Sequence, residues 1–200
     1  MAKVCLTGGI ACGKSLLSRF LRELGVETID ADDIVHELMP DPAERRRIAA
    51  EVFADPAKRK ALEAKIHPLV KARIEAFIAG HPGDSGYSGL SGGSGYSGVS
   101  GVPKIRLAII PLLFETHWDS EYDIICCVAS ERETQISRMT ATRGYTREEA
   151  EARLAAQMPV EEKAAKSHYV IDNNGTAEEL RYKAEEFVKW LKSSTCSQDP

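Results

Sequence analysis

The residues whose types and spacing stand out chemically lie near the N-terminus, where positions 8–15 read GGIACGKS. The pattern G-x-x-x-x-G-K-S is typical of a phosphate-binding loop, in which successive backbone N–H groups point at phosphate oxygens at the start of a helix. Gly9 belongs to this loop. Gly13 lets the backbone approach the phosphates closely, Lys14 reaches the outer phosphates, and the Ser15 hydroxyl can ligate Mg²⁺. The loop follows a predicted strand and opens a predicted helix, so we predict that it binds a nucleotide.

Two positions of this loop carry side chains where glycine is often expected. Ala11 and Cys12 occupy variable positions of the motif, where the main-chain N–H matters more than the side chain. If the loop is exposed, we expect Cys12 to be sensitive to alkylation, because a helix N-terminus lowers the pKa of a thiol.

A second chemical signal is the acidic pair in IDAD, residues 29–32. Asp30 and Asp32 follow a predicted strand, at the edge where an α/β sheet binds its ligands. Either carboxylate could accept the proton of an acceptor hydroxyl or orient the Mg²⁺ shell, and either could instead cap the following helix. The base-reading N-K-x-D of a GTPase is missing from the sequence.

The segment 133–157 is polar, rich in arginine and helical by pattern. Its arginines could form a mobile lid that closes over the phosphates and stabilises charge on the transferred group. For Arg147 and Arg153 we favour a solvated helix laced with Glu–Arg pairs instead.

These residues need a scaffold, and the hydrophobic pattern predicts one. Short apolar runs at 3–7, 26–29, 105–110, 122–129 and 168–171 are typical of buried strands, and helices are predicted at 14–24 and from about 177 to 191. This alternation predicts a doubly wound, mostly parallel α/β sheet. Residues 42–79 interrupt it with helices that Pro42, Pro56 and Pro68 punctuate, which predicts a helical appendage.

Composition limits the class of protein. The 200 residues suit one globular domain, and the net charge of −4 gives no basic footprint for nucleic acid. Five cysteines without C-x-x-C spacing suggest neither a disulfide framework nor a zinc site. Neither a membrane span nor a secretory signal is evident, so we expect a cytoplasmic protein. Six Ser-Gly-x triplets at 85–102 are typical of a flexible linker.

Motifs strung along nearly the whole chain resemble those of the dephospho-CoA kinases. They are LTGGIACGKS, IDAD, RRRIAAEVFADP, HP at 67–68, PLLFE at 111–115, Q..R....R at 135–143 and VIDNNG at 170–175. The resemblance implies a five-stranded P-loop kinase core with a helical CoA-binding domain and an arginine-bearing lid. It also implies transfer of the ATP γ-phosphate to the ribose 3′-hydroxyl of dephospho-CoA, with Mg²⁺ as the metal.

The resemblance also assigns roles by position. Asp32 matches the acid used towards the acceptor hydroxyl, residues 11–16 match the ATP-binding loop, and Arg138 and Arg143 match lid arginines. Asn173 matches the segment that flanks adenine. Positions on the acceptor side are matched by Arg45, His67, Leu113 and Glu115.

Some features depart from the family pattern. The stretch before ERRRIAAEVF is shorter than usual, Leu16 replaces the usual threonine, and His168 stands where aspartate is often found. The expected domains are a kinase core at 1–39 and 103–192 with a lid at about 138–165, a shortened acceptor-binding domain at 40–80, a linker at 81–102 and a tail at 193–200.

Two other functions share the loop. Another small-metabolite or nucleoside kinase would lack the acceptor-side motifs, and a nucleotide-binding module with weakened catalysis would not need Lys14, Asp32 and Arg138 together. We expect a small-molecule acceptor, no nucleic-acid or membrane partner, and a monomer or weak homo-oligomer.

Overall fold

The structure is a computed structural model that describes residues 2–80 and 105–196. The strands are β1 (Val4–Gly8), β2 (Glu27–Asp30), β3 (Arg106–Ile109), β4 (Ile124–Ala129) and β5 (Tyr169–Asp172). The helices are α1 (Lys14–Glu23), α2 (Ala31–Leu38), α3 (Pro42–Ala54), α4 (Pro56–Ala79), α5 (Arg132–Arg143), α6 (Arg147–Ala155), α7 (Val160–Ala165) and α8 (Ala177–Cys196), with a 3-10 turn at Asp119–Glu121. The Ser-Gly-x triplets lie outside the described residues.

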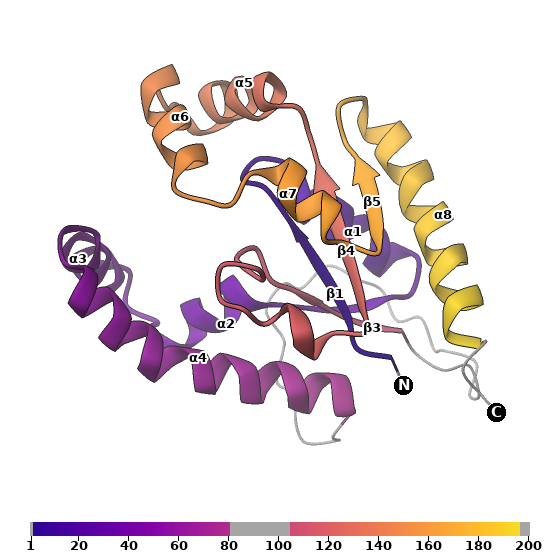
Figure 1. Ribbon diagram of the computed structural model, residues 1–200, viewed down its shortest axis with the longest axis horizontal. Coiled ribbons are helices and arrows are strands. Elements are labelled where there is room, and N and C mark those ends of the chain that lie inside the picture. The colour runs from indigo at the N-terminus through magenta and orange to yellow at the C-terminus, as the bar shows by residue number, and fades with distance from the viewer. Residues whose placement is uncertain (1, 81–104, 197–200) are drawn as a thin grey trace. The chain divides into compact units, whose positions relative to one another are not determined.

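The strands form one parallel sheet in the order β2-β3-β1-β4-β5, as predicted (Figure 1). The central strand β1 pairs with β3 on one side and with β4 on the other, with Leu6 opposite Ile109 and Cys126. The chain leaves β1 towards one edge of the sheet and later crosses to the other edge, so the loop after β1 emerges where the winding direction reverses. Ligands of doubly wound sheets bind at this point.

By its contacts, the chain divides into two compact units, with junctions at Thr28–Ile29 and Lys104–Ile105. In the first unit, α1 packs beside α8, and α7 packs on β1 and β4. Figure 1 shows α7 in front of the sheet and α1 behind it. Successive side chains of β1 point to opposite faces of the sheet, so they meet different layers of the protein. Leu6 belongs to the apolar core with Leu17 and Phe187, whereas its neighbour Thr7 bonds to Pro111 O.

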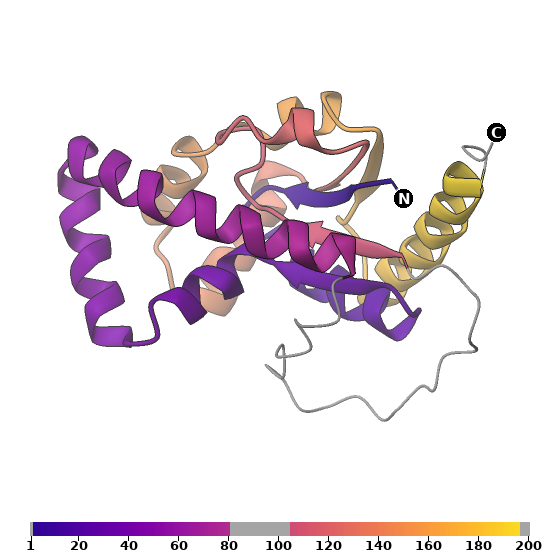
Figure 2. The same ribbon diagram turned by 90° about the horizontal axis from the view of Figure 1, so that it is seen from below.

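The second unit is helical over the segment where helices were predicted, and α4 contacts both α2 and α3 (Figure 2). The side chains of Asp41 and Asp55 cap α3 and α4, and a proline occupies the first turn of each helix. Pro68 does not end a helix, contrary to the prediction, because α4 runs through it. The buried residues Val70, Ile74 and Ile78 recur every fourth position beyond it, and their burial offsets the hydrogen bond that proline removes.

The C-terminal helix extends further than the sequence pattern indicated. We expected the tail to begin at residue 193, but α8 continues to Cys196. The apolar stripe of Phe187, Val188 and Leu191 is buried in the core, and the Ser193 hydroxyl donates to Trp190 O at 2.8 Å. Docking of this stripe carries the helix past the last apolar residue. Over residues 2–80 and 105–196, none of the helices is long and apolar enough to cross a membrane.

Candidate nucleotide-binding site

The loop after β1 turns into α1 through Gly13, which has a left-handed conformation with φ of 93°. A β-carbon at this position would overlap the side-chain amide of Asn173, so both the conformation and the close approach require glycine. Leu17 N–H donates to Gly13 O at 3.0 Å, the first hydrogen bond of the helix. The N–H groups of the preceding residues stand at the positive end of α1, where an anion is favoured.

Lys14 and Ser15 open α1, as the motif requires. Lys14 Nζ donates to two carbonyls of its own loop, to Gly8 O at 2.9 Å and to Gly9 O at 2.8 Å. The Ser15 side chain is exposed at the helix start. The structure therefore places a cation and a hydroxyl on the loop itself.

The side chains of the atypical loop positions face the protein interior. Cys12 is fully buried, and burial raises the pKa of its thiol even though Lys14 lies nearby. The reactivity of Cys12 was expected only for an exposed loop, and the buried thiol does not meet that condition. Ile10 and Ala11 pack against a cluster of Ile136, Met139 and Ala150, which belong to α5 and α6. The described cysteines Cys5, Cys12, Cys126 and Cys127 are free thiols.

A polar network joins the loop to the strand ends behind it. The Asn173 amide donates through Nδ2 to Cys12 O at 2.8 Å, and Asn173 O accepts from the Ser130 hydroxyl at 2.8 Å. Arg138 adds three bonds, from Nη2 to Asn173 O at 2.8 Å and from Nη1 to Ser130 Oγ at 3.0 Å and Ala11 O at 3.4 Å. Arg138 and Asn173 thus hold the backbone of the loop from outside.

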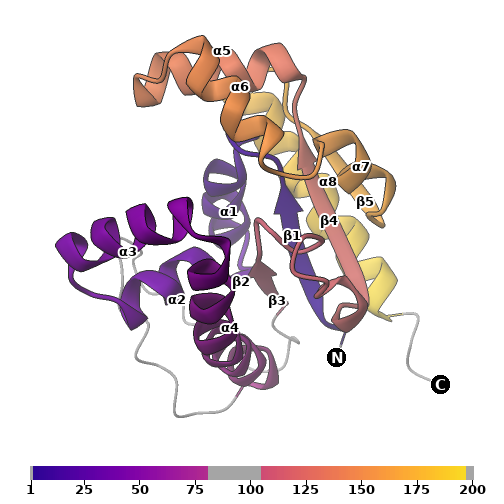
Figure 3. The same ribbon diagram turned by 60° about the vertical axis from the view of Figure 1, so that its left-hand side comes forward.

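The helices α5 and α6 form a hairpin beyond the carboxyl ends of β1 and β4 (Figure 3). Arg147 of α6 pairs with Glu133 of α5 at 2.6 Å and with Glu151 at 3.2 Å. The Arg153 guanidinium lies 3.9 Å from the ring centre of Tyr145. These contacts agree with the surface role favoured for Arg147 and Arg153, whereas Arg143 is exposed at the end of α5.

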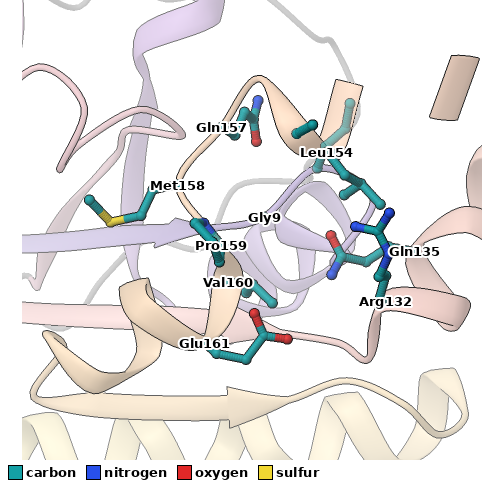
Figure 4. Close-up of a pocket in the computed structure, with 11 residues that line it drawn as sticks. Gly9, Arg132, Gln135, Leu154, Gln157, Met158, Pro159, Val160 and Glu161 are labelled. Carbon is teal, nitrogen blue, oxygen red and sulfur yellow. The ribbon is translucent and has the colours of Figure 1, made fainter. Parts of the chain in front are cut away.

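A pocket of about 220 Å³ lies beside the loop (Figure 4). Its wall includes Gly9 and Ile10 of the loop, Gln135 of α5 and the chain from Met158 to Glu161. Gln135 is 3% exposed, and its Nε2 donates to Ser130 O at 2.9 Å. Its Oε1 has no hydrogen-bond partner among the described residues. The pocket thus lies where the loop, α5 and the connection between α6 and α7 meet.

The two aspartates of IDAD occupy different positions at the start of α2. Asp30 is the N-cap residue, and its Oδ1 accepts from Asp32 N–H at 2.9 Å. Asp32 is exposed in the first turn. The capping role considered for either residue therefore falls to Asp30. Asp32 belongs to the second unit, and the phosphate-binding loop belongs to the first.

The four residues assigned to the acceptor side have distinct environments. Arg45 Nη1 donates to Pro40 O at 3.1 Å and to Met39 O, just after α2. His67 is half-buried within α4, and Leu113 is fully buried in the core. Glu115 Oε1 accepts from Met158 N–H at 3.0 Å and pairs with Lys163 Nζ at 2.8 Å. In this structure the side chains of Arg45 and Glu115 both make hydrogen bonds to other residues of the protein.

The sequence did not indicate a role for Lys163. This lysine is fully buried, which is rare for lysine. A weak signal exists, since Lys163 lies three residues after the buried Val160 and so shares its helix face. Ser130 was missed for a different reason. A single serine after a strand carries no motif, and its role depends on Asn173 and Arg138, which are distant in sequence.

Comparison with known proteins gives a consistent result. The sequence model of the dephospho-CoA kinase family matches residues 2–45 and 99–179. A dephospho-CoA kinase of Geobacter sulfurreducens is 39% identical and aligns over 94% of this chain and 96% of its own length. One from Symbiobacterium thermophilum is 37% identical, over 92% of this chain and 79% of its own length.

Solved structures share the fold. The dephospho-CoA kinase of Campylobacter jejuni superposes with a TM-score of 0.64 at 21% identity, covering 96% of this chain and 98% of its own. A shikimate kinase of Acinetobacter baumannii has a TM-score of 0.59 at 15% identity, covering 97% of this chain and 94% of its own. These likenesses confirm the P-loop kinase fold. Together with the sequence matches, they show that the chain belongs to the dephospho-CoA kinase family.

Proposed function

We propose that this protein transfers the γ-phosphate of ATP to the ribose 3′-hydroxyl of dephospho-CoA, which yields coenzyme A and ADP. The observation that carries the proposal is the relationship over almost the full chain to dephospho-CoA kinases, combined with an intact phosphate-binding loop at the winding reversal of the sheet. The rest of the site fits this chemistry, as the following residues indicate.

On the donor side, the backbone N–H groups of residues 11–16 and Lys14 would bind the phosphates. Leu16 contributes only its amide to this set. Mg²⁺ would be held by the Ser15 hydroxyl, by phosphate oxygens and by water, and when bound it neutralises charge on the β- and γ-phosphates. The residues fit such a site, because Ser15 is exposed at the head of α1. Among the described residues, no group of three His, Cys, Asp or Glu side chains gathers, which is compatible with a metal held mainly by the nucleotide.

On the acceptor side, Asp32 would orient the 3′-hydroxyl and take up its proton. The 3′-oxygen forms the new bond to the γ-phosphorus, the bond from that phosphorus to the bridging oxygen breaks, and ADP leaves with the electron pair. The exposed position of Asp32, beside a separate capping residue, supports this role. Arg45, His67 and Leu113 remain proposals for the acceptor-binding region.

The α5–α6 hairpin would act as the lid. Arg143 would approach the transferred phosphate on closure and exclude water together with the hairpin. Arg138 would contribute differently, because its guanidinium already binds Ala11 O and Asn173 O beside the loop. We propose that Arg138 holds the loop and the adenine-flanking segment in register, and that Arg143, at the end of the same helix, contacts the phosphate.

The decisive experiment follows ADP release from the purified protein with Mg-ATP and, separately, dephospho-CoA, adenosine, shikimate or gluconate. We expect release with dephospho-CoA well above that with the other three acceptors. Preference for another acceptor would replace this proposal with a different small-metabolite kinase. ATP binding without transfer to any acceptor would instead indicate a nucleotide-binding module.

A further inference from the structure

A buried ion pair lies outside the phosphate-binding loop, at the point where the chain returns from the α5–α6 hairpin. Lys163 of α7 is fully buried, and its Nζ lies 2.8 Å from Glu115 Oε1 and 2.8 Å from Pro111 O. Glu115 and Pro111 both belong to the segment after β3. A lysine without solvent requires a counter-charge, and this contact supplies it.

The same carboxylate oxygen, Glu115 Oε1, also bonds to the segment by which the chain leaves the α5–α6 hairpin. The connection between α6 and α7 comprises residues 156–159. Within it, Ala156 N–H and Gln157 N–H bond back to α6, and Pro159 has no N–H. Met158 N–H instead donates to Glu115 Oε1 at 3.0 Å, which ties the connection to the core.

In this arrangement each residue is held by the one before it, from Lys163 to Glu115 to Met158. Lys163 is fixed by α7, which packs on β1 and β4. It orients the Glu115 carboxylate, and the carboxylate in turn fixes Met158. An ion pair kept only for stability would need no backbone partner in a connection, and buried ion pairs are weak stabilisers in any case.

We infer that Glu115 and Lys163 are positioning residues that fix the pivot of the α5–α6 hairpin. This inference rests on the proposed function, because it gives the hairpin the role of a lid. The hairpin is then held at two points. Arg138, in the middle of α5, ties that helix to the loop, and the Glu115–Lys163 pair ties the exit of the hairpin to the sheet. Arg143 can reach a reproducible position only if both points hold.

A competing role exists for Glu115. Its second oxygen, Oε2, is buried and has no hydrogen-bond partner among the described residues. It could accept a hydrogen bond from the acceptor substrate, as the family position implies. The two roles differ in which kinetic constant changes, since loss of a substrate contact raises KM, whereas a displaced lid lowers kcat.

The test uses the full chain with Glu115→Gln, Lys163→Met and the double substitution. The measurements are kcat, KM for ATP and for dephospho-CoA, and amide hydrogen exchange at Met158 by NMR without substrate. We expect each single substitution to lower kcat about 10- to 100-fold with KM for dephospho-CoA within about threefold, and the double to be no worse than the more severe single. Met158 N–H should exchange about tenfold faster, while the amides of β4 stay protected.

Glu162→Gln is the matched control, because Glu162 is an exposed carboxylate next to Lys163. It should match the parent in all four measurements. A raised KM for dephospho-CoA with unchanged kcat in Glu115→Gln would overturn the inference in favour of direct substrate binding. Unchanged exchange at Met158 would also overturn it.

Two features keep the test decisive. If Lys163→Met does not fold, Glu115→Gln alone carries both readouts, because glutamine matches glutamate in size while it removes the charge that Lys163 orients, and the residue is partly exposed. The exchange measurement needs no substrate, so it judges the anchoring of Met158 even if the parent protein transfers phosphate to a different acceptor. Failure of the parent with dephospho-CoA would instead count against the proposed function.

Discussion

At the start of α2, Asp30 accepts a hydrogen bond from Asp32 N–H, so the helix cap and the proposed acid are separate residues. We expect Asp32→Asn to lower the transfer rate about 10²- to 10⁴-fold, because an amide cannot accept the hydroxyl proton. ATP affinity, measured by calorimetry, should change little.

The neighbouring aspartate gives a control for that substitution. Asp30→Asn preserves a side-chain oxygen for the cap, and asparagine is as good an N-cap as aspartate. It should retain most of the transfer rate. Loss of ATP affinity in Asp32→Asn would reassign this residue to metal binding or to structure.

Asn173 uses both its backbone and its side chain to join the phosphate-binding loop to the ends of β4 and β5. Its side chain donates to Cys12 O, and its carbonyl accepts from Ser130 and Arg138. We expect Asn173→Ala to lower the free energy of unfolding by about 1–3 kcal/mol, since a buried carbonyl loses its donor. Kd for ATP should rise as the loop loosens, and urea denaturation with calorimetry measures both effects.

The control for Asn173 is the adjacent residue. Asn174 is exposed, its Oδ1 accepts from Glu131 N–H at 2.8 Å and its Nδ2 donates to Asp172, so Asn174→Ala removes these surface contacts and leaves the Cys12 contact intact. This variant should show parental affinity for ATP. Equal effects of the two substitutions would argue that the segment as a whole, and not the Cys12 contact, matters.

The buried thiol of Cys127 makes the free energy of unfolding depend on pH in the alkaline range. Burial raises the pKa of its thiol from the ordinary value of 9.0 to about 12. The folded protein therefore keeps this proton when the unfolded chain has released it, so stability falls as pH rises from about 9 to about 12. A single such group changes the free energy of unfolding by up to about 1.4 kcal/mol per pH unit.

We expect Cys127→Ala to make the decline in stability between pH 9 and 11 less steep than in the parent protein. Urea denaturation at several pH values measures the slope. At pH 7 the pH dependence of the two proteins should coincide, because the thiol is protonated in both states. Parallel curves throughout the alkaline range would contradict the assignment.

At the scale of the element, the residue just before strand β5 pairs with β4 through both its side chain and its backbone. His168 Nδ1 accepts from Ile125 N–H at 3.0 Å, and His168 N–H donates to Ile125 O at 2.8 Å. An aspartate oxygen at this position can accept the same bond, so the hydrogen-bonding role does not require an imidazole.

We expect His168→Ala to lower the free energy of unfolding by about 1 kcal/mol through loss of this bond, whereas His168→Asp should retain most of the parental stability. Thermal unfolding followed by circular dichroism compares the three proteins. If both substitutions destabilise equally, packing of the imidazole and not hydrogen bonding explains the residue.

Helix α4 shows where element-level prediction failed and why. A proline inside a helical pattern is a sound indication of a helix end, because it removes one hydrogen bond and clashes with the preceding turn. At Pro68 the apolar face on either side continues in phase, and burial of Val70 and Ile74 outweighs the local cost. Pro42 and Pro56, at first-turn positions, obeyed the local rule because no such conflict arises there.

At the scale of the whole molecule, the pattern of apolar residues in the sequence was sufficient to predict the parallel sheet. The strands β1, β3 and β4 are continuous apolar runs, and such runs are visible without tertiary information. The phosphate-binding loop was visible because its function depends on local backbone geometry. The buried contacts of Lys163 and Ser130 were not visible, since each joins segments far apart in the chain.

Nucleotide binding should stabilise the whole protein. ATP at about 100 times its Kd adds about 2.7 kcal/mol to the folded state, which for a chain of this size raises Tm by roughly 5–10 °C. We expect this shift in a fluorescence melt and its loss in Lys14→Ala. The exposed Lys166→Ala is the matched control and should show the full shift.

The two bonds from Lys14 Nζ to Gly8 O and Gly9 O have a consequence for affinity. They place the Gly8 and Gly9 carbonyls in competition with the phosphates for the Lys14 ammonium, because each carbonyl accepts from one of its N–H donors. Measured ATP affinity is therefore a net quantity from which the cost of this exchange is already subtracted. In return, the ammonium neutralises the dipoles of these two carbonyls and braces the loop from within.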